Sequence, residues 1–303
     1  MAGVFRTARD ARRETEVVVV RVEAGGVVGR GECVPYARYG ETTASVLASI
    51  DAASRGESLT AGAAREAWEA AHLDVEARRT GVPVYERLGL ARPRPVQTAW
   101  SLGIDTPEAV AGKARERRGW GTLKVKVDAE SALAVVEAVR AAAPDSRLIV
   151  DANEGFSPDD WRQVAPRLAE LGVSLVEQPL AVGDDAVLRE LRPVPVCADE
   201  SVHTAEDVPG LRDRYDAVNI KLGKTGGLRE GLRLAAAARA AGMQVMVGCQ
   251  VCTSLGLAPA VLVAQGAEWV DLDGPLLLAR DREGGLRYDG DRVSPADGGF
   301  WGG

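Results

Sequence analysis

From residue 96 to residue 273 the sequence alternates short runs of β-branched and aliphatic residues with alanine-rich helical segments. Two helix starts are marked by an N-cap residue followed by proline, at Thr106-Pro107 and Ser157-Pro158. Strands that alternate with helices form a parallel sheet, and a count of eight favours closure into a barrel. The eight runs cover residues 96–102, 123–127, 148–153, 175–179, 196–201, 217–222, 245–249 and 269–273.

An open, doubly wound sheet is the competing architecture. Such a sheet would normally carry a glycine-rich phosphate-binding turn after its first strand, and residues 102–106 (LGIDT) are not such a turn. Before the alternation begins, two strand patterns flank Gly25-Gly26, and two helical patterns follow at 42–53 and 61–79. We therefore predict an α/β protein in three parts: an N-terminal α+β capping domain (residues 1–92), a (β/α)8-type barrel of the modified (β/α)7β form (93–280), and a C-terminal tail that packs back on the cap (281–303).

The composition argues against several classes of function. A net charge of −7 and a pI near 5.2 are unsuited to a nucleic-acid-binding surface, which would need a basic stripe. No apolar run reaches the roughly 18 to 20 residues that span a bilayer, and the N-terminus has no apolar signal core. We expect a cytoplasmic protein with a small-molecule substrate and neither a nucleic-acid nor a membrane partner. Only His72 and His203 are present, so acid–base chemistry falls to Lys, Asp, Glu or Cys.

Two lysines flank one valine inside the run 123–127. Side chains alternate along a strand, so Lys124 and Lys126 point to the same face. Neighbouring ammonium groups and burial both disfavour the charged form, so one lysine could reach the neutral state that a general base needs. The alternative is an edge strand with its lysines in water. The recurrence of polar side chains two residues apart on later strands favours a functional site over a solvent-exposed edge strand.

Polar residues end most of the later strands, where barrels carry their catalytic groups. Asp151, Glu177 and Asp199 follow three consecutive strands and would converge on one point. A ligand set of oxygens without His or Cys selects a hard divalent ion, here Mg²⁺. Lysines of the second and sixth strands, the latter being Lys221, would flank that ion from opposite sides. A metal that binds a carboxylate stabilises the enediolate formed on loss of the α-proton, and opposed lysines could remove and return that proton.

Other polar residues at these strand ends have more than one interpretation. Each could simply cap a strand or face solvent, or it could support the inner residues. We expect Asn153, Glu200 and Asn219 to support the inner residues of the site.

These motifs resemble the enolase superfamily, its muconate-lactonizing subgroup, and within that subgroup the dipeptide epimerases. The resemblance covers nearly the whole chain, and its metal and lysine motifs identify the subgroup rather than the reaction. The segments that carry it are GECVPYARYGE (31–41), KVK (124–126), DAN (151–153), VEQP (176–179), ADES (198–201), NIKLGKTGG (219–227), CTS (252–254) and DLDGP (271–275).

The resemblance implies a role for each of these polar residues. Lys126 and Lys221 would be the acid/base pair, and Lys124 would help the metal to neutralise the substrate carboxylate. Asp271 and Asp273 lie two residues apart, and two carboxylates suit an α-ammonium group, so the pair would anchor the N-terminus of a dipeptide. The alternative is that these aspartates only cap the last strand.

Specificity for the epimerised residue would come from the capping domain. A glutamyl side chain needs a cation there, and Arg9, Arg12 and Arg38 are the candidates. The chain also departs from the family pattern, since Gly223 stands where relatives carry Asp and Gln250 replaces a usual Met. The pocket beside Lys221 could therefore differ.

We expect a magnesium-dependent isomerase that epimerises the C-terminal residue of a dipeptide, with L-Ala-D/L-Glu as the first substrate to test. The alternatives on the same site are an N-acylamino acid racemase and an activity like that of o-succinylbenzoate synthase or a cycloisomerase. A barrel that only binds a metal or a small acid is a third possibility. We also expect a symmetric homo-oligomer.

Overall fold

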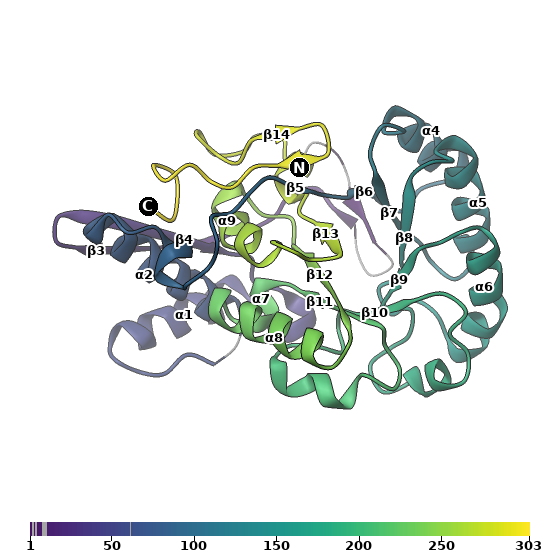
Figure 1. The fold of residues 1–303 in the computed structure, drawn as a ribbon, viewed down its shortest axis with the longest axis horizontal. Helices are drawn as coiled ribbons and strands as arrows, with labels where there is room; N and C mark the ends of the chain where they lie inside the picture. Colours follow the sequence, from purple (N-terminus) through teal and green to yellow (C-terminus); the bar gives the residue numbers. More distant parts are fainter. Residues whose placement is uncertain (2, 4, 8–10, 61) are drawn as a thin grey trace.

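The computed structural model describes the chain except residues 2, 4, 8–10 and 61. Its largest sheet has eight parallel strands that follow one another around the sheet in chain order, which confirms the predicted barrel (Figure 1). The strands are β6 (Trp100–Leu102), β7 (Thr122–Lys126), β8 (Arg147–Asp151), β9 (Leu175–Glu177), β10 (Val196–Ala198), β11 (Ala217–Ile220), β12 (Gln244–Gly248) and β13 (Trp269–Asp271).

The edges of this sheet are joined by single hydrogen bonds rather than by a regular ladder. The backbone N–H of Ala99 donates to the carbonyl oxygen of Val270 at 2.8 Å. The N–H of Leu272 donates to Oγ1 of Thr98 at 2.7 Å. These contacts bring the two ends of the sheet together and close the barrel.

A layer of buried side chains forms an apolar cluster inside the barrel. Most of its members are aliphatic, and nearly all of them lie on the barrel strands. The cluster therefore fills the barrel interior on the N-terminal side of the strand ends. The members are Ala99, Ile149, Leu175, Cys197, Ala217, Met246 and Trp269.

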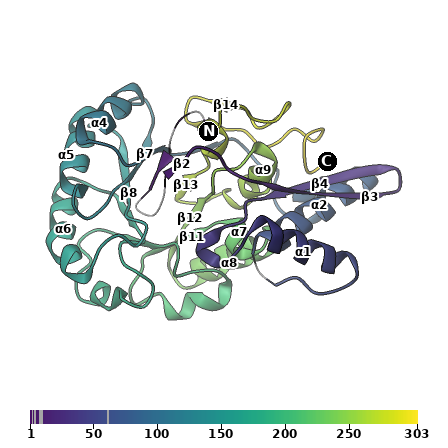
Figure 2. The same cartoon turned by 180° about the vertical axis from the view of Figure 1, so that it is seen from behind.

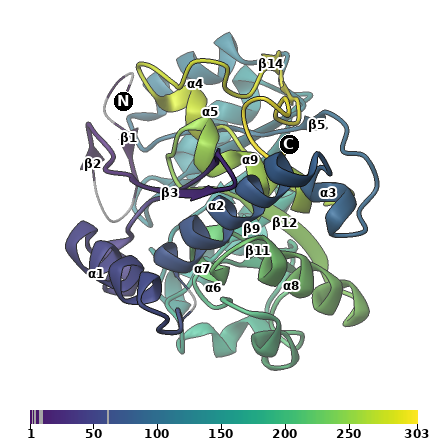
Figure 3. The same cartoon turned by 90° about the vertical axis from the view of Figure 1, so that its left-hand side faces the viewer.

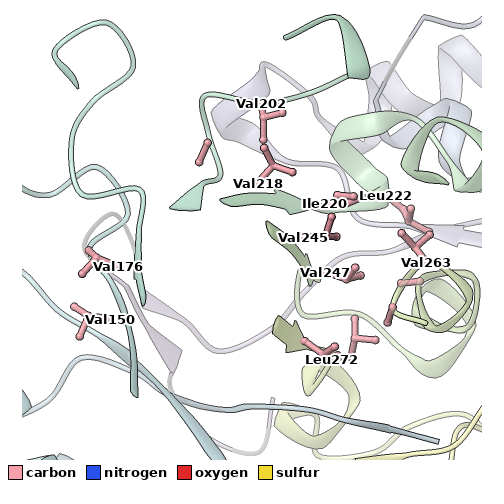
Figure 4. Packing of buried hydrophobic residues seen from close by; sticks show 14 of the residues in the cluster. Val150, Val176, Val202, Val218, Ile220, Leu222, Val245, Val247, Val263 and Leu272 are labelled. Atoms are coloured by element: carbon pink, nitrogen blue, oxygen red, sulfur yellow. The ribbon is translucent and has the colours of Figure 1, made fainter. Parts of the chain in front are cut away.

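Strand residues next to this layer point outward and pack under the helices. Figure 4 shows Val218 beside Val202, and Val247 close to Val263 of helix α9. The α-helices around the barrel are α4 (Pro107–Glu116), α5 (Ala132–Ala142), α6 (Pro158–Glu170), α7 (Leu222–Thr225), α8 (Leu228–Ala240) and α9 (Ser254–Val263).

Two connections differ from the predicted alternation of strand and α-helix. After β9 and β10 the chain forms only 3₁₀ segments, η2 (Asp185–Arg189) and η3 (Ala205–Gly210). Pro209 lies inside η3, and proline removes the N–H that a continuing α-helix would use. The predicted first strand is also divided, because β5 (Val96–Gln97) pairs with the C-terminal tail and only β6 joins the barrel.

The N-terminal part is an α+β unit, as predicted. Its antiparallel strands β3 (Val18–Ala24) and β4 (Val27–Cys33) lie against helix α2 (Ala63–Thr80), and Figures 2 and 3 show this unit beside the open end of the barrel. Its other elements are β1 (Phe5–Arg6), β2 (Ala11–Arg12), η1 (Ala37–Tyr39), α1 (Thr43–Ser54) and α3 (Val84–Arg87).

The tail after η4 (Gly274–Leu277) contacts the N-terminal unit. A hairpin of β14 (Tyr288–Asp289) and β15 (Arg292–Val293) precedes the last residues. Trp301 donates from Nε1 to the carbonyl oxygen of Ala70 at 3.3 Å. The boundaries at residues 93 and 281 stay predictions. In the described part of the chain, no helix is long and apolar enough to cross a bilayer.

The packing of β4 on α2 yields a stability prediction. A Cβ on Gly31 would lie 2.1 Å from the carbonyl oxygen of Ala67 and 2.7 Å from the N–H nitrogen of Ala71, and both are backbone atoms that cannot move aside. We expect Gly31→Ala to lower the free energy of unfolding by about 3 kcal/mol, measured by urea denaturation.

Gly112→Ala is the matched control. Gly112 lies within α4, and a Cβ there meets no atom within 4 Å. Alanine should leave stability unchanged or raise it by up to about 1 kcal/mol, because it reduces the freedom of the unfolded chain. Equal effects of the two substitutions would contradict the close packing of β4 on α2.

Candidate active site

Strand alternation carries the polar residues to the mouth of the barrel. Residues two apart on a strand share a face, so the position two residues after each member of the apolar layer faces the same interior. The pairing Lys126↔Asp151↔Glu177 places residues of three neighbouring strands side by side. The residues that follow the layer in this way are Ser101, Asp151, Glu177, Asp199, Asn219, Gly248 and Asp271.

Lys124 lies at the centre of the acidic cluster. Its Nζ is 2.7 Å from Oε2 of Glu177, 2.9 Å from Oδ2 of Asp271 and 3.1 Å from Oδ2 of Asp151. Burial lowers the pKa of Lys124, but the surrounding carboxylates outweigh burial and hold that pKa well above its usual value. Lys124 is therefore a fixed cation that holds the neighbouring acids together.

Lys126 and Lys221 lie on opposite sides of the barrel mouth. Lys126 is on β7, and Lys221 follows β11, which is four strands away in a barrel of eight. Nζ of Lys126 donates to Oδ2 of Asp151 at 2.6 Å and to Oδ1 of Asn153 at 2.9 Å. Nζ of Lys221 donates to Oδ2 of Asp199 at 2.7 Å.

The pKa of Lys221, like that of Lys124, lies above its usual value, whereas we expected one lysine of the Lys124–Lys126 pair to lose its proton. Burial lowers that pKa, but Asp199 and Glu177 raise it more, so the result lies well above the usual value. Burial and neighbouring ammonium groups alone would lower such a pKa, but Asp199 at 2.7 Å and Glu177 at 3.7 Å reverse the shift. In this arrangement Lys221 is protonated and is ready to act as an acid.

Asp151, Glu177 and Asp199 are buried on consecutive strands. As their side chains stand, no three His, Cys, Asp or Glu side chains among the described residues have metal-binding geometry. The physical reason is that lysine ammonium groups lie between the carboxylates, with Lys124 against Asp151 and Glu177 and with Lys221 against Asp199. The lysines thus hold positions where a cation would neutralise the same acids.

The chemistry of this donor set nevertheless fits a hard cation. The three side chains offer oxygen ligands only, as Mg²⁺ prefers. Burial and, next, the nearby Asp151 raise the pKa of Glu177 to about 7, so the lysines do not fully offset the loss of solvent and the repulsion between these two acids. A divalent ion would relieve that repulsion. The assignment of the three residues as ligands stays a prediction.

Two further residues of this site were not anticipated. Lys224 is buried, and its Nζ donates to Oδ1 of Asp199 at 2.5 Å and to the carbonyl oxygen of Asn219 at 3.0 Å. The available signal was a second lysine one helical turn after Lys221. Gln178 accepts through Oε1 from the backbone N–H of Asp199 at 2.9 Å, and nothing in its sequence position indicated that role.

The residues expected to support the acids occupy different positions. Asn219 donates from Nδ2 to Oε1 of Glu177 at 2.8 Å, which orients that carboxylate. The side chain of Asn153 accepts from Lys126, and its backbone N–H donates to Oδ1 of Asp151, so this residue contacts both a lysine and an acid. Glu200 is buried beside Asp199 in the chain.

Asp271 and Asp273 lie together at the end of β13. Ser101 donates from its backbone N–H to Oδ2 of Asp273 at 2.6 Å and from Oγ to Oδ1 of Asp271 at 3.2 Å. Burial and the neighbouring Asp271 raise the pKa of Asp273 to about 7. Two buried carboxylates in contact with one serine form a site that a cation would stabilise.

The three arginines proposed for the substrate side chain have different outcomes. Arg9 lies outside the described residues. Arg12 ends strand β2, and its side chain is also outside the described part. Arg38 of η1 donates from Nε and Nη2 to the two carboxylate oxygens of Glu154, at 3.0 and 2.9 Å. Its guanidinium thus has a protein partner, and its contact with substrate stays a prediction.

A cavity of about 100 Å³ lies between the lysines and the capping domain. Its wall combines catalytic candidates with residues of the cap and of the loop after β12. The lining consists of Thr7, Tyr36, Tyr39, Lys126, Asn153, Asp199, Lys221, Cys249, Gln250 and Val251.

The departure at Gly223 has a structural counterpart. A Cβ on Gly223 would lie 2.7 Å from Oε1 of Gln250 and 3.3 Å from Oε2 of Glu66, so these side chains occupy the space that a larger residue would fill. Glu66 comes from helix α2 of the cap, and burial with the nearby Glu32 raises its pKa well above the usual value. Side chains of the cap and of the barrel therefore fill the space at Gly223 in the pocket beside Lys221.

A capped barrel with opposed lysines and a ring of acids at its mouth defines an enolase-type enzyme. Residues 108–297 match the family described as enolase C-terminal domain-like, and residues 2–89 match the mandelate racemase/muconate lactonizing enzyme N-terminal domain. The chain therefore belongs to the mandelate racemase/muconate lactonizing enzyme family of the enolase superfamily, which confirms the resemblance seen in its motifs.

Relatives of known activity are epimerases and racemases, which are isomerases. The chain is 43% identical over 298 residues to L-Ala-D/L-Glu epimerase of Escherichia coli K12, covering 94% of this chain and 93% of that protein. It is 40% identical over 301 residues to N-acetyl-D-glutamate racemase of a Pseudoalteromonas species, covering 95% of each.

Solved structures lead to the same group. An enolase family member from Agrobacterium tumefaciens with homology to dipeptide epimerases, with bound sodium and L-Ala-L-Glu, has a TM-score of 0.96 and 47% identity, covering 99% of this chain and 96% of that one. Dipeptide epimerase of Enterococcus faecalis, complexed with Mg and L-Leu-L-Tyr, has a TM-score of 0.90 and 29% identity, covering 99% and 94%.

The raised pKa of Asp273 predicts a pH dependence of stability. A carboxyl group whose pKa is higher in the folded state stabilises the fold below its unfolded pKa of about 4, and that contribution is lost as the pH rises through about 7. Asp273→Asn cannot titrate. We expect the decline in the free energy of unfolding between pH 4 and 7, in buffer without divalent ions, to be smaller in this variant than in the wild type.

Urea titrations at several pH values would measure this difference. Asp289→Asn, on the exposed part of β14, is the control and should follow the wild-type curve. If the free energy of unfolding of Asp273→Asn followed the wild-type curve across this pH range, the raised pKa of Asp273 would be contradicted.

Proposed function

We propose that this protein is a magnesium-dependent dipeptide epimerase that inverts the α-carbon of the C-terminal residue, with L-Ala-D/L-Glu as the first substrate. The observation that carries the proposal is the placement of Lys126 and Lys221 on opposite sides of a buried group of acids. Groups on opposite faces of a carbon acid can remove a proton from one side and deliver one from the other, and the result is inversion. The relatives named above support the substrate class.

Asp151, Glu177 and Asp199 are the residues that would hold Mg²⁺. When bound, the ion draws charge from the substrate carboxylate and so stabilises the anion that forms on loss of the α-proton. The Enterococcus faecalis epimerase was solved with Mg and a dipeptide, which supports this cofactor.

Lys124, Lys126 and Lys221 divide the remaining chemistry. Lys124 pairs with the substrate carboxylate, for which it must leave part of its contacts with Asp151 and Glu177. Lys126 and Lys221 move the proton at the α-carbon. Lys221 serves as an acid while Asp199 and Glu177 hold its proton, and it becomes a base when those carboxylates are neutralised by another cation.

Asp271 and Asp273 would bind the α-ammonium group of the dipeptide. In this structure Asp271 is paired with Lys124 at 2.9 Å, so movement of Lys124 toward a substrate carboxylate would free Asp271 for the ammonium group. The substrate carboxylate would thus pair with Lys124 and the substrate ammonium with Asp271, in place of the present Lys124–Asp271 pair. The net charge of the site would change little.

Racemisation of an N-acylated amino acid is the second candidate function. The Pseudoalteromonas racemase, at 40% identity, is named for an N-acetylated substrate. An N-acyl group carries no ammonium, so it would meet Asp273 best in the protonated form that a pKa of about 7 allows. The same lysines would move the proton in either reaction.

Other features proposed from the sequence stay predictions. They are the cytoplasmic location, the homo-oligomeric state and the contribution of Arg9, Arg12 and Arg38 to substrate binding.

Replacement of either lysine tests the two-base reaction. We expect Lys126→Ala and Lys221→Ala each to lower epimerisation of L-Ala-L-Glu at least about 1000-fold, the scale of lost acid–base catalysis. Each variant should still exchange the α-proton of one epimer in heavy water, and the two variants should retain opposite epimers. Proton NMR in the presence of Mg²⁺ measures both quantities.

Lys113→Ala is the control for these variants, because Lys113 is exposed on α4 and pairs with Asp105. It should behave as the wild type. Full turnover in both active-site variants would end the two-base assignment.

Comparison of free and N-acetylated substrates separates the two candidate functions. We expect turnover of L-Ala-L-Glu to exceed that of N-acetyl-Glu by about 100-fold, since loss of a buried charge pair costs several kcal/mol. Asp273→Asn should lower this ratio, because it should slow turnover of the free dipeptide and leave turnover of N-acetyl-Glu unchanged. Similar wild-type rates on both substrates, measured by polarimetry, would favour the racemase and leave Asp271 and Asp273 without the proposed role.

A further inference from the structure

Three residues next to the active site have a backbone conformation that is rare for side chains other than glycine. Among the described non-glycine residues, positive φ occurs only at Asn153 (46°), Glu154 (65°) and Gln178 (33°). Such conformations are strained and persist where the surroundings hold them. All three directly follow the strands that carry Asp151 and Glu177.

Hydrogen bonds join these two strained segments. The backbone N–H of Glu154 donates to the carbonyl oxygen of Gln178 at 2.8 Å. The N–H of Asn153 donates to Oδ1 of Asp151 at 2.9 Å. The loops after β8 and β9 therefore form one unit beside the acids.

One carboxylate fastens this unit to the capping domain. Glu154 accepts hydrogen bonds from Nε and Nη2 of Arg38, and its Oε1 also accepts from the backbone N–H of Val182 at 3.1 Å. A bidentate pair of this kind fixes direction as well as distance. Arg38 belongs to η1 of the cap, whereas Val182 lies in the loop after β9, so Glu154 connects three segments.

The unit acts on one lysine of the site. Asn153 precedes Glu154 in the chain, and its Oδ1 accepts from Nζ of Lys126 at 2.9 Å. Lys221 instead pairs with the carboxylate of Asp199 at 2.7 Å, whereas the unit contacts Asp199 at its backbone N–H, which donates to Oε1 of Gln178. The loop that Glu154 holds therefore orients the lysine of β7.

We propose that Arg38 and Glu154 are positioning residues that make the orientation of Lys126, and not that of Lys221, depend on contact between cap and barrel. The inference rests on the proposed function, because it assigns the two lysines to opposite faces of one substrate carbon. Loss of the pair releases the strained backbone at Asn153, and Lys126 then loses one of its two oriented acceptors and keeps Asp151 alone. One face of the substrate is affected more than the other.

Exchange of the α-proton in heavy water tests this asymmetry. Glu154→Gln and Arg38→Met are compared with the wild type on L-Ala-L-Glu and L-Ala-D-Glu, and Lys126→Ala and Lys221→Ala identify which epimer each lysine serves. We expect exchange on the Lys126 face to fall about 10-fold or more, with less than a twofold change on the Lys221 face. Arg38→Lys keeps the positive charge but cannot form the bidentate contact, so its exchange rate on the Lys126 face should lie between those of the wild type and Arg38→Met.

Arg79→Met is the matched control, because it breaks a bidentate pair with Glu76 on the outer side of α2. It should leave exchange on both faces unchanged. Equal loss on both faces in Glu154→Gln, or no loss on either, would overturn the inference.

Amide hydrogen exchange gives a second readout that needs no substrate. Peptides covering residues 122–130 and 150–157 should exchange faster in Glu154→Gln than in the wild type, and Arg79→Met should leave them unchanged. Unchanged protection of both peptides in Glu154→Gln would refute the positioning role even if catalysis is altered. Failure of the wild type to exchange either dipeptide would instead refute the proposed function.

Discussion

The closed barrel constrains every other feature of this molecule, because side chains that point inward repeat every two residues along each strand. Ile149, Leu175 and Cys197 belong to the buried apolar layer, and the next inward positions are Asp151, Glu177 and Asp199. The layer below is apolar and excludes water, so the acids above it are partly stripped of solvent. The same packing that stabilises the barrel therefore creates the electrostatic conditions of the site.

Burial of so many acids would be costly without cations among them. Lys124, Lys126 and Lys221 supply those cations, and Lys224 adds a fourth against Asp199. The balance is incomplete, as the pKa of about 7 at Glu177 shows. A site of this kind gains from a divalent ion, and it can release its lysines to a substrate once that ion shares the negative charge. The stability of this acidic cluster and the availability of its lysines for a substrate depend on the same ion pairs.

The periodic features of the molecule could be predicted from the sequence, and the irregular ones could not. Strand alternation and polar strand ends identified the barrel, Lys124, Lys126 and Asp151, because these depend on local spacing alone. The connections after β9 and β10 were expected to be α-helices but are short 3₁₀ segments, and only the second of them, η3, contains a proline, Pro209. The raised pKa of Lys221 depends on distances between strands, which no local pattern contains.

Two of the polar contacts between the cap and the rest of the chain differ in their exposure to solvent. On the β12 side, the buried Glu32 accepts from Thr253 at 2.7 Å and from Arg282 at 2.6 Å. On the β8 side, Arg38 is 40% exposed where it meets Glu154, so water and salt weaken that pair. Arg282 is 33% exposed, close to the value for Arg38, but Glu32 is fully buried and is also bonded to Thr253, so the Glu32 contact is the firmer of the two. The weaker of the two lies beside Lys126, so its loss would act on the loop that orients this lysine.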